Sequence, residues 1–200
     1  MRDQITNRLR DTQPPADPVA AALAKLSPEI AQAWFTGPLE SAAVLIPLLL
    51  RPDGMTVLLT RRTEHVKDHA GQISFPGGRA ETTDNGPRDT ALRETAEEIG
   101  IPPEDVRVIG YLDAYPVVTG YAVVPVVGMV DGSPDLVLDP IEVAQAFEVP
   151  LAFLLDEDNL ARTTRTYKGV QFDTYEYLYD GHRIWGATAH IIRNFINIII

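Results

Sequence analysis

The chain has 200 residues and a net charge of -11, from 28 acidic and 17 basic side chains, and it contains no cysteine. Disulfide bonds and thiolate metal sites are therefore excluded, and the negative charge argues against a nucleic-acid partner. The length suits one domain with its own core, and a hydrophobic content of 45% is ordinary for a globular chain.

The sequence shows no segment for export or for membrane insertion. Its start, MRDQITNRLRDTQPPADP, contains no apolar run typical of a secretory signal. No stretch reaches the about 18 uninterrupted apolar residues that indicate a membrane span. We therefore expect no membrane partner and a cytoplasmic location. The oligomeric state stays open, with a homodimer as one expectation.

Prolines punctuate residues 1–40, which we interpret as an N-terminal helical lead-in to a domain over residues 41–200. In DPVAAALAKL an aspartate precedes Pro18, and in SPEIAQAWF Ser27 precedes Pro28. A capping side chain followed by proline at the first helical position is typical of a helix start. The pattern predicts two short helices.

The remaining elements alternate between strands and helices. AAVLIPLLL and MTVLLT flank the turn signal RPDG, which predicts a β-hairpin. GQISFPGG is an extended segment, and GPRDTALRETAEEIG predicts a helix from Pro87 to just before Gly100. Further along we expect strands in VRVIGYL, YAVVPVVGMV and EVAQAFEVP, a short helix in LAFLLDEDNL, a hairpin with YDGH at its turn, and a closing helix in GATAHIIRNFI. This order predicts a mixed sheet between helical layers.

The helix ALRETAEEIG gathers three glutamates, Glu94, Glu97 and Glu98. At roughly 100° per residue they lie opposite an apolar side that includes Leu92 and Ile99. The arrangement is either an ordinary solvated face or a site for a divalent cation, whose preferred ligands are carboxylate oxygens. The glycine turn just before the helix favours the second interpretation, because glycines let the backbone approach a ligand closely.

The same residues resemble the box of the Nudix family, G-x5-E-x7-R-E-U-x-E-E-x-G-U, where U is a bulky apolar residue. The matching positions are Gly78, Arg93, Glu94, Glu97, Glu98, Gly100 and Ile101. Asp84 stands where the box has glutamate, the spacer to Arg93 has eight residues instead of seven, and Thr95 replaces an aliphatic residue. The longer spacer is similar to that of one subgroup, the coenzyme A diphosphatases.

A second segment, Leu58 to Gly78, resembles the signature L-L-[TF]-x-R-[SA]-x3-R-x3-G-x3-F-P-G-G of that subgroup. Thr63 replaces serine or alanine and Lys67 replaces arginine, while Arg62, Gly71 and the Phe-Pro-Gly-Gly run match. The two resemblances cover roughly residues 42–197.

The resemblance implies an α/β fold of the α/β/α sandwich type with a mixed sheet, and metal-dependent hydrolysis of a nucleoside diphosphate derivative. Mg²⁺ or Mn²⁺ is the implied cofactor, with Glu94, Glu97, Glu98 and the Gly78 backbone as ligands. Glu94 and Glu98 are the implied catalytic carboxylates, and Arg93 is expected to hold a carboxylate in place. Glu81 and Asp84 are weaker candidates that assist through water or cap the helix.

A small-molecule substrate of the coenzyme A type carries extra phosphate, and RRTEHVKDH supplies cations next to the glycine turn. Arg62 and Lys67 are the expected substrate-binding cations, together with Gly77 and with Glu142 from a later loop. Asp139 and Glu148 compete with Glu142 for that role. Two other functions stay open: hydrolysis of another nucleotide such as ADP-ribose or a dinucleotide, and nucleotide binding without catalysis.

Overall fold

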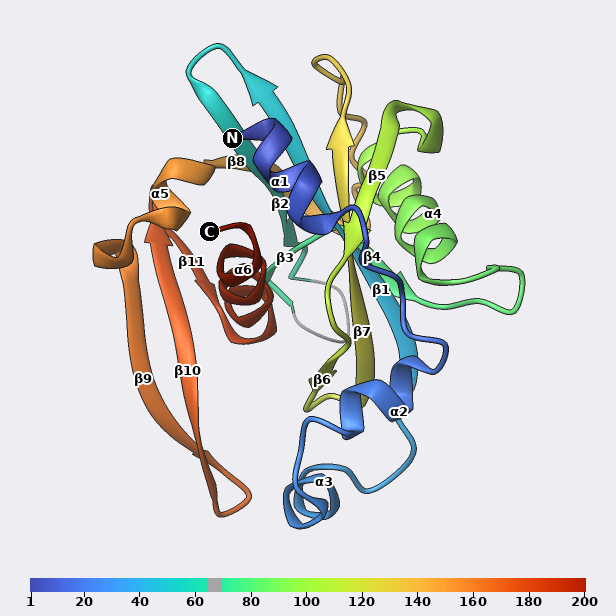
Figure 1. Ribbon diagram of the computed structural model, residues 1–200, viewed down its shortest axis with the longest axis vertical. Helices are drawn as coiled ribbons and strands as arrows, with labels where there is room; N and C mark the ends of the chain where they lie inside the picture. The colour runs from blue at the N-terminus through green and yellow to red at the C-terminus, as the bar shows by residue number, and fades with distance from the viewer. Residues whose placement is uncertain (65–69) are drawn as a thin grey trace.

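The computed structural model describes residues 1–64 and 70–200. Within these residues, eight strands form one mixed sheet and three more form a separate antiparallel sheet. Helices cover both faces of the larger sheet, as Figure 1 shows. The α/β/α sandwich expected from the sequence is therefore confirmed.

The larger sheet is built around β1 (Glu40–Arg51), which pairs in parallel with β7 (Tyr121–Val130). The other edge of β1 is shared, because its second half pairs with β2 (Gly54–Arg62) and its first half with β4 (Gly77–Arg79). The remaining strands are β3 (Ile73–Ser74), β5 (Val106–Tyr111), β6 (Tyr115–Val117) and β8 (Val143–Pro150). This split edge brings the glycine pair Gly77–Gly78 into the sheet.

The predicted hairpin and the two main helices are confirmed. Arg51 pairs with Gly54 across the RPDG turn. Helix α4 (Pro87–Ile99) lies on one side of the sheet and α6 (Gly186–Ile199) on the other. Successive residues of a strand point to opposite faces, so β1 feeds both cores: Leu45 packs in the α4 layer and Ile46 in the α6 layer.

Residues 1–40 form three helices, α1 (Arg2–Leu9), α2 (Pro18–Leu23) and α3 (Pro28–Trp34). The sequence predicted α2 and α3, with Asp17 and Ser27 as caps, but not α1. Ile5 and Leu9 of α1 are fully buried in the α6 layer. The lead-in therefore contributes to the main core, and its last residue, Glu40, is already the first residue of β1.

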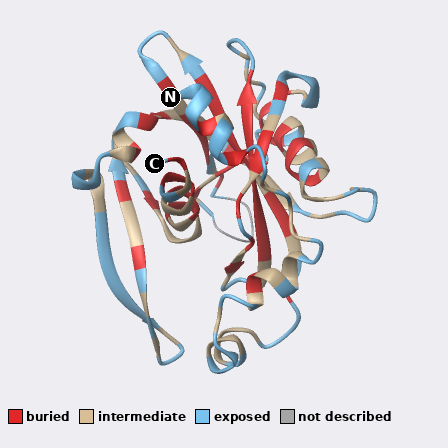
Figure 2. Cartoon of the chain, in the orientation of Figure 1, coloured by how far each residue is buried: buried red, intermediate tan, exposed pale blue. Residues whose placement is uncertain are grey.

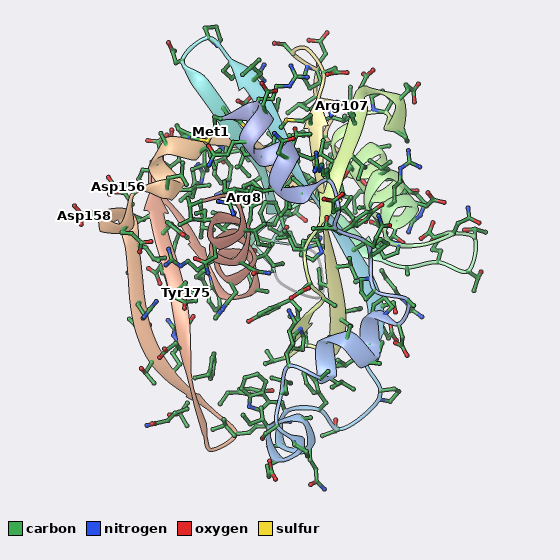
Figure 3. All side chains as sticks on the ribbon, viewed as in Figure 1. Met1, Arg8, Arg107, Asp156, Asp158 and Tyr175 are labelled. Atoms are coloured by element: carbon green, nitrogen blue, oxygen red, sulfur yellow. The ribbon has the colours of Figure 1, made fainter. Side chains whose placement is uncertain are left out.

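The second sheet projects from the body as an arm made of β9 (Leu160–Tyr167), β10 (Val170–Tyr179) and β11 (His182–Trp185). One hairpin was expected here, and the structure adds a third strand, with turns at Lys168–Gly169 and Asp180–Gly181. Strand β9 is mostly exposed, whereas the central strands of the body are buried (Figure 2). Tyr175 of β10 (Figure 3) lies with its ring 4.8 Å from that of His190 on α6, which ties the arm to the body.

Short elements complete the chain: α5 (Leu151–Leu155) and the 3-10 turns Pro103–Asp105 and Glu157–Asn159. None of the helices in the described residues is both long and apolar enough to cross a bilayer.

Candidate active site

Helix α4 begins and ends where the sequence predicts. Pro87 occupies its first turn, and Gly100 caps its end in the left-handed conformation, with φ of 75° and its N–H donating to the carbonyl of Ala96. Glycine adopts this conformation without steric cost. The two ends set the length of the helix, and the burial of Ala91, Leu92 and Ile99 against the sheet sets its rotation and therefore the directions of its glutamates.

Of the two interpretations of the glutamate face, an ordinary solvated face is wrong for Glu98. The Glu98 side chain is only 4% exposed, whereas the Glu97 side chain is 61% exposed. The cause is β4, which passes beside α4 and covers Glu98: the N–H of Gly77 donates to its Oε2 at 3.3 Å. A wheel describes one helix and takes no account of neighbouring backbone.

Glu98 is buried without full neutralisation. The guanidinium of Arg62 lies 3.5 Å from its Oε1, and burial raises the pKa of Glu98 to about 8, a rise opposed by Arg62 and by the Gly77 N–H. Glu142 and Glu94 raise it further. A carboxyl in such surroundings gains from any additional positive charge.

Glu94 lies against the glycine turn. A Cβ at Gly78 would come within 2.5 Å of the Glu94 carboxyl carbon, so only glycine leaves space for this side chain. Gly77 has φ of 149°, and a Cβ there would collide with the Ala43 carbonyl oxygen across the sheet. Burial raises the pKa of Glu94, with Arg93 opposing the rise.

Arg93 holds several carboxylates together. Its guanidinium contacts Glu94 at 2.9 Å, Glu97 at 3.1 Å and Asp84 at 3.1 Å, and it also donates to the carbonyl of Arg79. The pKa of Asp84 falls to about 2, chiefly because Arg93 donates hydrogen bonds to it. Asp84 is thus a buried anchor for Arg93, a contact that the sequence interpretation of Asp84 as a cap or a water-mediated helper missed.

The other acidic candidates differ in whether they lie near this site. Glu142 lies near the site, with its Oε2 3.5 Å from Arg62. Glu148 lies on β8, where Arg51 and Thr56 bind it. The Asp139 carboxylate accepts a hydrogen bond from the N–H of Ile141, and Glu81 is exposed.

Arg62 is the expected substrate-binding cation that the structure describes, since Lys67 lies outside the described residues, as do His65 and His69. Its two ion pairs are long, and its buried Nε has no hydrogen-bond partner among the described residues. An unpaired buried donor is costly. Arg62 therefore keeps donor capacity for an anionic group.

A cavity of about 560 Å³ opens beside these groups. That volume lies within the range of about 300–1,000 Å³ typical of small-molecule sites. Its polar wall contains Arg62, Glu94, Glu142, Gly77 and Gly78. Its apolar wall contains Val117, Val118, Tyr121 and Trp185. Trp185 was not expected from the sequence, and its only signal was an aromatic residue next to the glycine that opens the closing helix.

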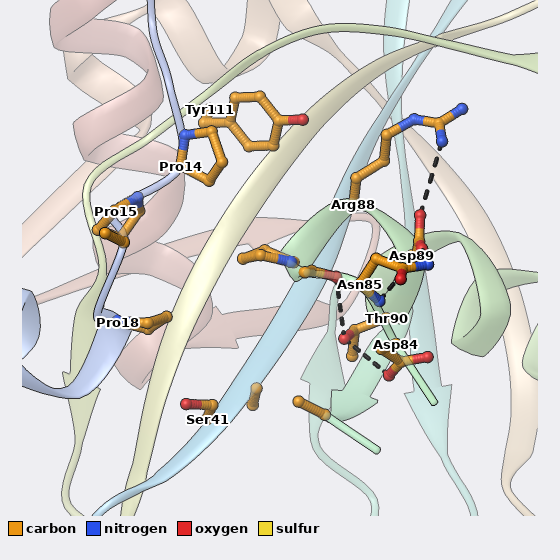
Figure 4. Close-up of a pocket in the computed structure, with 15 residues that line it drawn as sticks. Pro14, Pro15, Pro18, Ser41, Asp84, Asn85, Arg88, Asp89, Thr90 and Tyr111 are labelled. Carbon is orange, nitrogen blue, oxygen red and sulfur yellow. Dashed lines mark hydrogen bonds and ion pairs between the residues drawn. The ribbon is translucent and has the colours of Figure 1, made fainter. Parts of the chain in front are cut away.

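A second cavity of similar size, about 550 Å³, lies between the proline segment of the lead-in and the start of α4 (Figure 4). It is lined by Pro14, Tyr111, Arg88 and Asp84 among others, and by none of the three box glutamates. It is therefore a separate hollow from the cavity beside the carboxylates.

The carboxylates suit a divalent cation by chemistry, although no three acidic or histidine side chains in the described part of the chain already form a metal-binding group. Their donors are oxygens, which Mg²⁺ and Mn²⁺ prefer. Two of them, Glu94 and Glu98, have raised pKa values because burial outweighs their arginine partners. The donor set therefore fits a hard cation.

The fold and this acidic, glycine-bordered cavity define a hydrolase of the Nudix type, and comparison with known proteins agrees. The NUDIX domain matches residues 40–167. An uncharacterised Nudix hydrolase, NudL, of Photorhabdus laumondii is 43% identical over 76% of this chain and 80% of its own length. A protein of the same name from Yersinia pestis is 40% identical over 80% of both chains. A MutT/nudix family protein from Enterococcus faecalis has a solved structure with a TM-score of 0.49, at 19% identity over 94% of this chain and 76% of that chain.

The chain belongs to the Nudix hydrolase family. Its members hydrolyse pyrophosphate bonds in nucleoside diphosphate derivatives and generally use divalent metal ions.

Proposed function

We propose that this protein hydrolyses the diphosphate bond of coenzyme A or its derivatives, giving 3′,5′-ADP and 4′-phosphopantetheine or its acyl form. One observation carries the proposal: the segment from Leu58 to Gly78 with the subgroup signature supplies both Arg62 and the glycine turn to the cavity that also contains Glu94. The signature and the box thus meet at one cavity.

Glu94, Glu97, Glu98 and the Gly78 backbone would hold Mg²⁺ or Mn²⁺. When bound, such an ion neutralises phosphate charge and lowers the pKa of water. Glu97 is the exposed member and now pairs with Arg93. Binding of a cation therefore competes with that ion pair, and Arg93 keeps Asp84 as its buried partner.

The residues of the chain bind the substrate, accept a proton and hold the reacting groups in position. Arg62 donates to a phosphate oxygen of the substrate, and the backbone of Gly77 borders the cavity that receives the diphosphate. Water adds to one phosphorus, the bridging P–O bond breaks, and a box carboxylate, Glu94 or Glu98, accepts the proton from the water. Arg93 acts as a positioning residue, and Glu142, which pairs with Arg62, borders the substrate.

The test is incubation of coenzyme A with the protein and Mg²⁺ or Mn²⁺, with products separated by chromatography. We expect metal-dependent release of the two products and a loss of about 10²–10⁴-fold in rate for Glu98→Gln. Glu148→Gln is the matched control, because it removes a carboxylate outside the cavity, and it should keep the wild-type rate. Cleavage of ADP-ribose or dinucleotides without cleavage of coenzyme A would reject the substrate, and no turnover of any of them would reject catalysis.

A further inference from the structure

The arm carries positive charge to the apolar end of the catalytic cavity. Residues 160–185 contain four cationic side chains and three acidic ones in a chain whose net charge is -11. The indole of Trp185 lines the cavity, and the guanidinium carbons of Arg165 and Arg183 lie 5.7 Å and 5.3 Å from its ring centre. Two arginines therefore adjoin one wall of a cavity whose other wall contains Glu94 and Arg62.

The two arginines differ in how far they are neutralised. Arg183 forms an ion pair with Glu176 at 2.6 Å. Arg165 forms no ion pair or hydrogen bond within the part of the chain that the structure describes, and it is exposed on β9. A guanidinium that stacks on an aromatic ring keeps its N–H edge available for a phosphate.

The pairing of the strands sets Arg165 on the same face as Trp185. Arg165 pairs with Phe172, and Trp185 pairs with Glu176 four residues further along β10. Arg162 pairs with Tyr175 and therefore points to the other face.

Contacts at both ends hold this face of the arm in place. At its tip, Phe172 and Tyr167 pack edge-on against Trp34 of α3, with ring centres 5.3 Å and 6.1 Å apart, and Lys168 donates to the Trp34 carbonyl. At its base, Trp185 leads directly into α6. Arg165 lies between these two anchors and is therefore held near the body.

We infer that Arg165, stacked on Trp185, binds a second phosphate of the substrate, one attached to the ribose and remote from the diphosphate that is cleaved. The inference rests on the proposed function, because coenzyme A carries such a phosphate at the ribose 3′ position. It assigns to the arm a role in substrate specificity that neither the box nor the signature contains.

The test compares ligands that differ by that one phosphate. Calorimetry with Mg²⁺ present would measure the binding of 3′,5′-ADP and of 5′-AMP to the full chain, to Arg165→Gln and to the matched control Arg162→Gln. We expect wild type and Arg162→Gln to bind 3′,5′-ADP about tenfold more tightly than 5′-AMP, as one exposed charged contact would give. Arg165→Gln should bind the two ligands equally.

Kinetics supply the second measurement. Arg165→Gln should raise KM for coenzyme A about tenfold and leave KM for 3′-dephospho-coenzyme A unchanged. A preference for 3′,5′-ADP that survives in Arg165→Gln, or one absent from the wild type, would overturn the inference. Failure of the wild type to cleave coenzyme A would count against the proposed function alone, because the binding comparison decides the role of Arg165 without turnover.

Discussion

Two arginine–carboxylate clusters of this protein differ in how completely their charges are neutralised. Between β1, β2 and β8, Glu148 accepts hydrogen bonds from Arg51 and Thr56, and Arg51 holds the pKa of Glu148 below its ordinary value. Beside α4, by contrast, the pKa values of Glu94 and Glu98 are raised, because burial outweighs the nearby arginines.

The difference separates a cluster that joins strands from one that is ready to bind a cation. In the first cluster, one guanidinium faces one carboxylate. In the second, Arg93 contacts three carboxylates and Arg62 contacts two, both at 3.5 Å. Excess negative charge in a partly dry site is costly unless a cation joins it. Variants that act on one cluster and spare the other test this interpretation.

Among the activity measurements that compare the two clusters, the largest expected effect comes from Gly78→Ala. The new Cβ would overlap the Glu94 carboxylate, so Glu94 must move, and a displacement of about 1 Å at a reacting group costs on the order of 10²-fold in rate. The measurement is kcat/KM for the diphosphate substrate at saturating Mg²⁺.

Gly37→Ala is the matched control, since a Cβ there meets no atom within 4 Å and should leave the rate unchanged. Wild-type activity in Gly78→Ala would show that the position of Glu94 is unimportant for the chemistry.

Arg93→Lys should have a smaller effect, about a tenfold loss in kcat, because lysine keeps the charge but not the planar fork that reaches several carboxylates at once. Arg51→Lys changes the other cluster in the same way. We expect it to lower thermal stability and leave kcat at the wild-type level.

Equal kinetic losses in these two variants would remove the distinction between the clusters. Melting temperatures of both variants, measured beside the kinetics, separate a loss of fold from a loss of positioning.

The sequence predicted the elements better than it predicted their contacts. The ends of α4 were correct because Pro87 and Gly100 act locally, through backbone conformation. The burial of Glu98 was missed because it depends on β4, a strand that pairs with β1 more than thirty residues earlier in the chain. Helix α1 was missed because its charged sequence shows little apolar pattern beyond the buried Ile5 and Leu9.

The same holds for the candidate site, where the sequence predicted which residues take part but not all of their contacts. The box and the signature identified the residues around the cavity from short spacings alone. Asp84 beneath Arg93, and Trp185 across the cavity, became visible only in three dimensions. Asp84 and Arg93 belong to one box, but its spacing does not say which carboxylate the guanidinium contacts, and Trp185 lies far along the chain from the glycine turn.

A further expected effect, on stability and not on rate, is a dependence of metal-free stability on pH. The folded protein keeps a proton on Glu98 up to about pH 8, whereas the unfolded chain releases it near the ordinary value of 4.5. Folding therefore binds a proton between these values, and the contribution of Glu98 to stability falls as pH rises from about 4.5 to about 8. His190 has the opposite effect on the pH dependence of stability, since burial lowers its pKa. The informative quantity is therefore the difference in the free energy of unfolding between wild type and Glu98→Gln.

Melting temperatures measured in the presence of a chelator should therefore show that the stability of Glu98→Gln, relative to that of the wild type, increases as pH rises. The advantage should reach on the order of 2 kcal/mol at pH 8, with Mg²⁺ reducing it. Glu148→Gln should show the reverse, with a deficit that is present at neutral pH and shrinks as pH falls below about 4.5, because the wild type then loses the charge that Arg51 stabilises. Parallel curves for wild type and Glu98→Gln would mean that Arg62 and the Gly77 N–H already neutralise Glu98, and the contrast between the two clusters would then lose its electrostatic basis.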